Sequence, residues 1–341
     1  MDILNKLKKE IVLGDGGYIL ELEKRGYIKA GPFTPEAVVK RPEAVIELHR
    51  EHVRAGVDVL QALCFYAHKD KLKSSNSQKF FEKINRNAVM LARKAANENK
   101  KKKVFVAGNL SETWQYKPND KKAENETRKA FREQIRMQKG VDFFIAETIE
   151  WLGEAIIALE EIKKAGYAAM ITFTIKNKEK VNEGIGIVRA CRILEEKGAD
   201  IVGLNCARDP KRMLPVMKKI RKAVRCYTAM QPNAFRCTNK LKYFMAQKYQ
   251  GRVAFPLELD PFQLSRMDMA EYAKMAKKMG INYIGSCCGS VACHTREMAT
   301  VLGKTGEAHN YLPNLSVHPI IGSKKNIKEP DKDVLEQSRN I

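Results

Sequence analysis

The sequence predicts an α/β fold, and within that class a single (β/α)8 TIM barrel. Eight short apolar runs alternate with amphipathic stretches long enough to form helices. Parallel strands need crossover connections of that kind. The runs are mostly apolar rather than alternating, as expected of strands covered on both faces. Eight such units in roughly 300 residues favour a closed barrel, and a doubly wound sheet is the alternative.

Each candidate strand is a short run rich in β-branched and other apolar residues, a composition typical of strands. In chain order, the predicted strands are residues 11–13, 57–60, 103–107, 141–146, 168–175, 200–204, 225–230 and 282–285.

Between these runs, apolar side chains recur at the three- and four-residue spacing of a helix with one buried face. In residues 150–165, Leu152, Ala155, Ile156, Leu159 and Ile162 share such a face. The predicted helices include residues 36–55, 79–97, 122–139, 150–165, 179–197, 210–224 and 267–279.

The chain contains no linker rich in Pro, Gly or Ser that would divide it. We therefore expect residues 1–309 to form one barrel. Residues 310–341 are polar and interrupted by Pro313, Pro319 and Pro330, which predicts a short C-terminal tail.

Composition and charge exclude several classes of protein. The chain is 44% hydrophobic, too apolar for a disordered chain, and lacks the apolar run of about 18 residues that spans a membrane. Its first residues are too charged for a signal peptide, which predicts a cytoplasmic protein. Lys and Arg number 62 against 40 Asp and Glu, a net charge of +22. These basic residues are spread along the chain without a basic-aromatic stripe, so solvated helix faces explain them better than nucleic-acid binding.

Three cysteines at the ends of two predicted strands are the most informative residues. In a barrel of this kind, reactive side chains lie where strands end and loops begin. Cys206 follows the sixth strand, and Cys287 and Cys288 follow the eighth. Three thiolates can bind Zn²⁺ and leave its fourth position open for a substrate. Spacing alone would equally allow buried packing residues, and the barrel register favours the metal site.

The sulfur-rich ligand set indicates a particular use of zinc. Thiolates donate charge and weaken the Lewis acidity that hydroxide formation requires. They suit a zinc that binds an incoming thiol, removes its proton and leaves the sulfur nucleophilic. The residues therefore indicate alkyl transfer to a substrate thiol.

Six stretches also carry a resemblance to a known family. They are Gly-Asp-Gly-Gly at 14–17, Leu-Glu-Lys-Arg-Gly-Tyr at 22–27, Lys-Ala-Gly-Pro-Phe-Thr-Pro-Glu-Ala at 29–37, Phe-Tyr-Ala at 65–67 with Asp-Lys-Leu at 70–72, Leu-Asn-Cys at 204–206 and Gly-Ser-Cys-Cys-Gly at 285–289. With these motifs, the chain resembles the zinc-dependent homocysteine S-methyltransferases. Residues 22–37 make it most similar to the betaine–homocysteine branch.

The resemblance implies a barrel that transfers a methyl group to homocysteine and forms methionine, with Zn²⁺ held by Cys206, Cys287 and Cys288. Carboxylates would hold the ammonium group of homocysteine. The thiolate would displace the methyl group directly, with no catalytic side chain beyond the zinc ligands. The substrate-binding residues that the resemblance implies are Asp15, Gly16, Phe33, Phe65, Tyr66 and Glu147, with Asp15 and Glu147 at the ammonium end.

The donor is expected to be betaine or a similar methylated onium compound, held by aromatic faces from Phe33, Phe65, Tyr66 and Trp114. Phe33 and Thr148 stand where the betaine branch has Trp and Tyr. S-methylmethionine is therefore an alternative donor, and methyl transfer to a separate corrinoid protein is an alternative reaction. We expect small-molecule substrates and no membrane partner, and the sequence allows a homo-oligomer.

Overall fold

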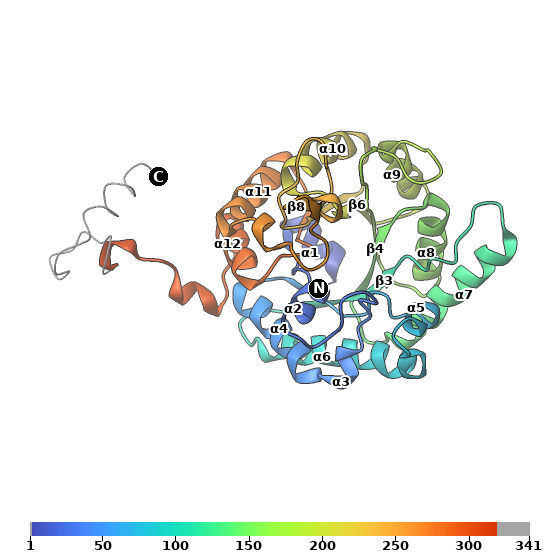
Figure 1. Cartoon of the computed structure of the whole chain (residues 1–341), viewed down its shortest axis with the longest axis horizontal. Coiled ribbons are helices and arrows are strands. Elements are labelled where there is room, and N and C mark those ends of the chain that lie inside the picture. The colour runs from blue at the N-terminus through green and yellow to red at the C-terminus, as the bar shows by residue number, and fades with distance from the viewer. Residues whose placement is uncertain (1, 319–341) are drawn as a thin grey trace.

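The computed structural model describes residues 2–318, and eight parallel strands form its centre. They are β1 (Val12–Leu13), β2 (Val59–Gln61), β3 (Phe105–Ser111), β4 (Phe143–Ile149), β5 (Ala169–Phe173), β6 (Ile201–Cys206), β7 (Tyr227–Pro232) and β10 (Tyr283–Ile284). Their order around the sheet is β1-β10-β7-β6-β5-β4-β3-β2. Helices surround the strands as a ring (Figure 1). The predicted (β/α)8 barrel is therefore confirmed, with a strand at each of the eight predicted positions.

The surrounding helices follow the predicted pattern and add several short elements. They are α1 (Ile3–Lys9), α2 (Ile19–Lys24), α3 (Ala37–Lys40), α4 (Pro42–Ala55), α5 (Lys69–Lys73), α6 (Phe81–Glu98), α7 (Lys121–Met137), α8 (Leu152–Lys164), α9 (Ile187–Glu196), α10 (Pro210–Ala223), α11 (Arg266–Met279) and α12 (Ala292–Leu302).

Two predicted helices were too long. The helix expected at 36–55 is split into α3 and α4, because Pro42 starts a new helix and forces Arg41 out of helical geometry, with a φ of −144°. The helix expected at 179–197 begins only at Ile187. Residues before it form a turn in which Lys180 pairs with Gly186, and Gly184 adopts a φ of +81°.

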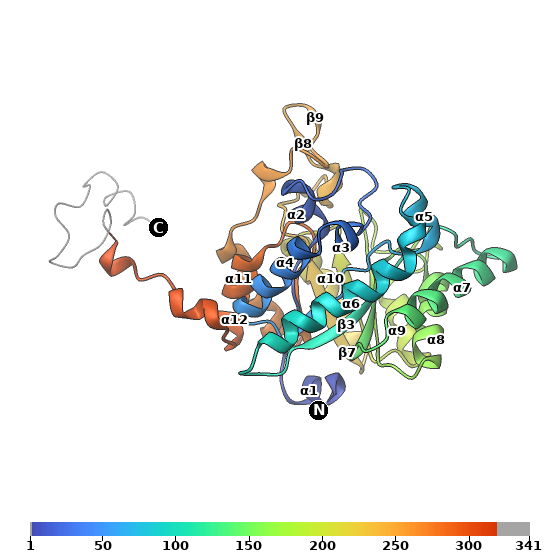
Figure 2. The same cartoon turned by 90° about the horizontal axis from the view of Figure 1, so that it is seen from below.

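The interior of the barrel is filled by apolar side chains at its amino end. Ile3 and Leu7 of α1 pack there against strand residues such as Phe105, Phe143 and Tyr283. Figure 2 shows α1 at one end of the barrel and the hairpin of β8 (Lys248–Tyr249) and β9 (Arg252–Val253) at the other. With the amino end closed, any cavity must open at the carboxyl end of the strands.

The two end strands of the sheet, β1 and β2, are joined by side-chain hydrogen bonds. Within the described residues, these two strands share no ladder pairing. Instead, the Leu13 backbone N–H donates to Asp58 Oδ2 at 2.9 Å, and the Gln61 backbone N–H donates to Asp15 Oδ2 at 2.7 Å. The Asp58 N–H also donates to the Leu13 carbonyl oxygen at 2.8 Å. Two aspartates therefore supply acceptors that a regular ladder would take from the main chain.

The Asp58 carboxylate also lies among three lysines at the amino end of the barrel. Lys304 lies 2.6 Å from Oδ2, while Lys102 and Lys6 lie 3.1 and 3.4 Å from Oδ1. Burial opposes the charged form of Asp58, but Lys102 and Lys304 outweigh it and hold the pKa of this carboxyl below its usual range.

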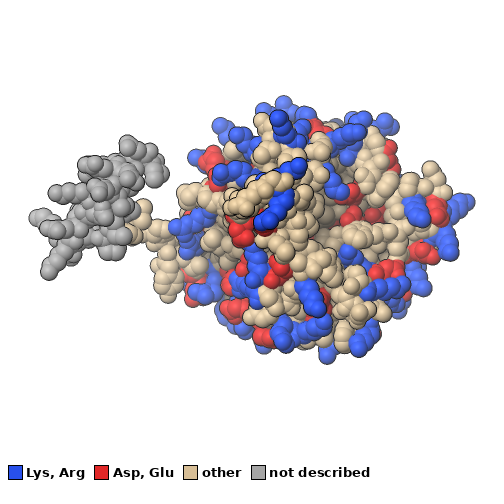
Figure 3. Space-filling model, viewed as in Figure 1, with Lys and Arg blue, Asp and Glu red and all other residues tan. Residues whose placement is uncertain are grey.

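The predicted tail is described only to residue 318, and residues 319–341 lie outside the described part. The 3-10 turn Glu307–Tyr311 lies against α4 and α12, and the turn Leu315–Val317 follows it farther from the barrel (Figures 1 and 2). Among residues 2–318, no helix is long and apolar enough to cross a membrane. Lys and Arg alternate with Asp and Glu over the face shown in Figure 3, which agrees with solvated surfaces as the source of the positive charge.

Candidate metal centre and substrate cavity

The structure brings together the three cysteines that the strand ends predicted. Cys206 is the last residue of β6, and Cys287 and Cys288 lie just beyond β10. Their Sγ atoms all lie within 4.8 Å of one another, with 3.6 Å between those of Cys206 and Cys288. Sulfurs that share one tetrahedral zinc at about 2.3 Å lie about 3.8 Å apart. The described sulfur cluster therefore fits a zinc ligand set.

The protonation of this cluster also fits a metal site. Hydrogen bonds from Cys287 and Cys288 hold the pKa of the Cys206 thiol well below its usual range, and the same sharing raises the pKa values of Cys287 and Cys288. The three sulfurs therefore share hydrogen bonds with one another. The Asn205 amide lies 4.0 Å from Cys287 Sγ and donates its shorter hydrogen bonds to Thr148 and Glu147.

A cavity of about 560 Å³ opens above the sulfurs at the carboxyl end of the strands. Its floor is polar, with Gln61, Asn109, Glu147 and Gln231 beside the cysteines. Its upper walls are mainly apolar and aromatic. Of the predicted substrate-binding residues, the cavity is lined by Gly16, Phe33, Phe65, Tyr66 and Glu147.

Glu147 is a buried carboxylate on this floor with amide partners only. Asn109 Nδ2 donates to it at 2.7 Å and Asn205 Nδ2 at 3.1 Å, and Gln61 Nε2 donates as well. Burial raises the pKa of Glu147 to about 7. Among residues 2–318, no Lys or Arg forms an ion pair with it. The charge of Glu147 is therefore available to a cationic group of a ligand.

Asp15, which the resemblance places at the ammonium group of homocysteine, is buried beneath the residues that line the cavity. It does not line the cavity, and only 1% of its surface is exposed. Its Oδ2 accepts hydrogen bonds from the Tyr18 hydroxyl at 2.6 Å and from the Gln61 backbone. Burial raises the pKa of Asp15 to about 7. Since Gln61 also contacts Glu147, Asp15 supports the floor of the cavity from beneath.

The aromatic residues expected around the donor lie on two walls. On one wall, the ring centroids of Phe65 and Tyr66 are 4.2 Å apart, and those of Tyr66 and Trp114 are 5.5 Å apart. Phe33 instead contacts Phe255, at 6.0 Å between centroids. The cavity therefore has aromatic faces on both sides and not one continuous cage.

Sequence reasoning missed the wall formed by residues 233–262, which follow β7. Tyr243, Phe244, Met245 and Phe255 of this segment line the cavity. The apolar character of these residues was visible, but the segment has no strand or helix period long enough to place it. Gln61 and Asn109 were also missed, although both lie near the carboxyl ends of predicted strands.

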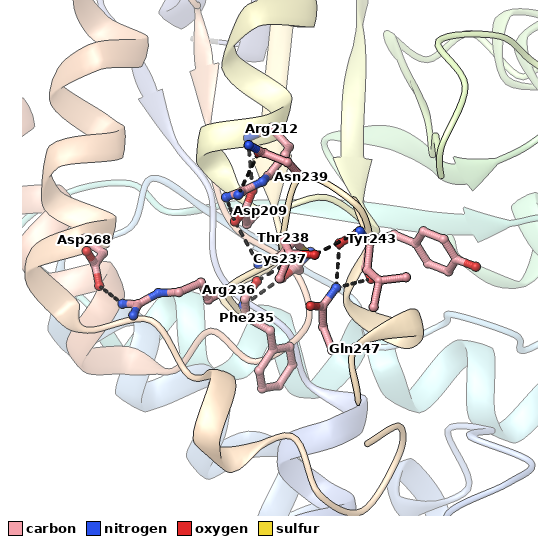
Figure 4. Close-up of polar contacts among 12 residues, drawn as sticks. Asp209, Arg212, Phe235, Arg236, Cys237, Thr238, Asn239, Tyr243, Gln247 and Asp268 are labelled. Carbon is pink, nitrogen blue, oxygen red and sulfur yellow. Dashed lines mark hydrogen bonds and ion pairs between the residues drawn. The ribbon is translucent and has the colours of Figure 1, made fainter. Parts of the chain in front are cut away.

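Polar contacts fix this segment against the barrel, as Figure 4 shows. Asp209 accepts from the Cys237 backbone N–H at 2.9 Å and pairs with Arg212 at 2.8 Å. Gln247 Nε2 donates to the carbonyl oxygens of Leu241 at 2.6 Å and Tyr243 at 2.9 Å. The apolar wall is therefore held in place by its own hydrogen bonds and by α10.

Comparisons with known proteins identify the family of the chain. A family model described as homocysteine S-methyltransferase matches residues 12–302. Betaine–homocysteine S-methyltransferase 1 of Xenopus laevis is 38% identical over 304 residues, which cover 86% of this chain and 73% of that protein. S-methylmethionine–homocysteine S-methyltransferase BHMT2 of Pongo abelii is 34% identical over 308 residues, covering 88% of this chain and 81% of that protein.

Among solved structures, the metallated form of the homocysteine methyltransferase MmuM of Escherichia coli is similar in fold. Its TM-score is 0.68 at 19% identity, and the match covers 87% of this chain and 98% of that one.

Proposed function

Because the chain belongs to the homocysteine S-methyltransferase family, we propose that it moves a methyl group from betaine, or a similar methylated onium compound, to homocysteine. The observation that carries this proposal is the arrangement at the cavity floor. Three sulfurs that can share one cation face the same space as Glu147, a buried carboxylate with no ion-pair partner among the described residues. A thiol and an ammonium group on one small molecule match these two features.

Cys206, Cys287 and Cys288 would hold Zn²⁺, and the sulfur donor set fits that ion. When bound, zinc supplies the Lewis acidity that lowers the pKa of the substrate thiol. The reaction needs no proton donor from the protein, because the leaving amine departs neutral.

Glu147 would bind the substrate ammonium group, with Gln61, Asn109 and Asn205 holding its carboxylate in place. Asp15 supports the same position through Gln61. The homocysteine sulfur then attacks the methyl carbon as the bond from carbon to the onium nitrogen breaks. The electron pair of that bond stays on nitrogen. Methionine and a neutral tertiary amine result, so atoms and charge balance.

The walls would position the donor and exclude water. Phe65 and Tyr66 offer ring faces to an onium group, and Phe33 and Phe255 close the opposite side. Holding the two reactants together accounts for a large part of the expected rate gain. Low water content also favours the reaction, because the two opposite charges disappear in the transition state.

S-methylmethionine is the second candidate donor. A relative named for that substrate is 34% identical, and Phe33 and Thr148 both line the cavity near the expected donor. We expect the enzyme to act in the cytoplasm, where thiols stay reduced.

The test is a methionine-formation assay with homocysteine and each donor in turn, run beside zinc analysis of the purified protein. Turnover with betaine at about one zinc per chain supports the main proposal. Turnover with S-methylmethionine alone selects the second donor. No methionine from any onium donor with zinc-loaded protein contradicts both.

A further inference from the structure

One carboxylate on the cavity wall is not explained by the binding of homocysteine. Glu112 follows β3 and lines the cavity beside Tyr66 and Trp114. Its Oε1 accepts a hydrogen bond from Trp114 Nε1 at 2.6 Å and one from the Tyr66 hydroxyl at 3.3 Å. Among residues 2–318, no hydrogen bond or ion pair reaches its Oε2. A partly buried carboxylate therefore faces the cavity with one oxygen free of protein partners.

The acidic neighbours of Glu112 are already matched, and Glu112 is not. Glu150 pairs with Lys176 at 2.6 Å. Glu154 accepts two hydrogen bonds of 2.7 Å from Thr113. Burial raises the pKa of Glu112 to about 7, although the bond from Trp114 opposes the shift. Lys71 and Lys176 attract its charged form at longer range. Among residues 2–318, no cation forms an ion pair with it, and a cationic ligand would supply one.

The Tyr66 and Trp114 rings beside Glu112 already contact one cation, the ammonium group of Lys71. Lys71 Nζ lies 3.4 Å from the Trp114 ring centroid and 4.6 Å from that of Tyr66. Lys71 itself does not line the cavity, whereas both rings do. The ammonium group therefore holds the rings in place from outside the cavity.

The charge of Lys71 has a further effect on the cavity side of the rings. A positive charge behind them opposes the approach of a second cation to their other faces. Glu112 accepts hydrogen bonds from both ring residues, and its negative charge offsets that repulsion. Without the carboxylate, the wall would offer only the two aromatic rings, and the Lys71 ammonium group would repel a second cation that approached them.

Resting on the proposed function, we propose that Glu112 is the counter-ion of the donor's onium group and determines the selectivity of the cavity for cationic methyl donors. The pair would be stronger before the reaction than in the transition state, because the positive charge of the donor disappears as the methyl group leaves. Glu112 therefore contributes to donor binding and not to the chemical step.

The test measures steady-state kinetics of Glu112→Gln in the zinc-loaded enzyme. We expect the KM of the onium donor to rise about tenfold, with kcat unchanged or higher and the KM of homocysteine unchanged. Glu82→Gln makes the same change in net charge on an exposed part of α6, where Glu82 pairs with Arg86, and should leave all three constants unchanged. A lower kcat at constant donor KM in Glu112→Gln would overturn the inference.

A binding measurement separates this inference from the proposed reaction. Tetramethylammonium serves as the probe, and Trp114 reports its binding by fluorescence in a Trp151→Phe background, because the chain has two Trp residues. We expect a Kd about tenfold weaker after Glu112→Gln. An equal Kd contradicts the role of Glu112. If no donor is turned over but the Kd still depends on Glu112, the proposed reaction fails and the cation site stands.

Discussion

The Sγ atoms of Cys206 and Cys288 lie 3.6 Å apart, although 82 positions separate the two residues in the chain. Their strands are not hydrogen-bonded to each other, because β7 lies between β6 and β10. Pairing of β7 with both β6 and β10 therefore assembles the sulfur cluster, and no local stretch of sequence could do so. Changes in the barrel near these strands should affect the metal as directly as changes in the cysteines.

Replacing Cys206 or Cys288 with Ser should remove zinc and activity together, because each would supply one of the three proposed thiolate ligands. We expect a loss of more than about a hundredfold in kcat/KM, with zinc content falling in parallel as measured by atomic emission. Cys293→Ser is the matched control, since this exposed cysteine lies outside the cluster. Full activity in metal-free Cys206→Ser protein would contradict the zinc site.

Replacing Glu147 with Gln should weaken homocysteine binding, because the neutral amide cannot offset a buried ammonium group. We expect the KM of homocysteine to rise about thirtyfold while the KM of the donor stays constant. Steady-state kinetics with each substrate varied in turn would measure this. An unchanged KM for homocysteine would remove Glu147 from the ammonium site.

Gly17→Ala should disturb the metal site from the loop after β1, the strand that pairs with β10. A Cβ at Gly17 would lie 2.8 Å from the Cys287 carbonyl oxygen and 3.1 Å from Cys288 Cα, so the cysteine loop must move. We expect zinc affinity to fall about tenfold in a chelator competition assay. Gly186→Ala is the control, because a Cβ there meets no atom within 4 Å. Equal zinc affinity in both variants would contradict this prediction, because the loop of Cys287 and Cys288 would then move without weakening zinc binding.

Asp58→Asn should destabilise the fold, since it leaves three lysines around an uncharged side chain that is 1% exposed. We expect the free energy of unfolding in urea to fall by about 3 kcal/mol at pH 7. The pKa of Asp58 is lowered in the fold, so its contribution is present above the pKa of the unfolded chain and is lost as pH falls through the folded value. The difference between the two proteins should therefore shrink in acid.

The control for this prediction is Asp260→Asn, which breaks a surface pair with Lys24. Exposed pairs of this kind contribute within about 1 kcal/mol. A constant difference between Asp58→Asn and the parent protein from pH 7 to pH 2 would contradict the assignment of the lost stability to the Asp58 charge.

Binding of tetramethylammonium should weaken as pH falls through about 7, where Glu112 takes up a proton. The probe itself does not titrate. The charged or titratable groups near Glu112 include Tyr66, His68, Lys71, Glu150, Glu154 and Lys176. Fluorescence titrations from pH 6 to pH 8 should show this dependence in the parent protein and a weaker dependence in Glu112→Gln, where Glu147 of the same cavity still titrates near pH 7. The same slope in both proteins would place the titrating group elsewhere.

Much of the barrel could be predicted from sequence, because its strands are separate apolar runs and its helices have a clear periodicity. The cysteine cluster followed from the rule that strand ends share one rim. Boundaries failed where single residues override periodicity, as Pro42 and Gly184 do. The wall at residues 233–262 could not be placed, because side-chain contacts such as that of Asp209 with the Cys237 backbone hold it, and these join distant parts of the chain.

The Asp15 carboxylate joins the first strand of the ring to the second and also places an ionisable group beneath the cavity floor. An inactive Asp15→Ala enzyme would therefore not reveal whether a lost charge or a loosened wall had stopped it. Asparagine at this position keeps an oxygen that can accept from the Gln61 backbone N–H. Comparing Asp15→Asn with Asp15→Ala therefore separates the loss of the charge from the loss of the contact between the two strands.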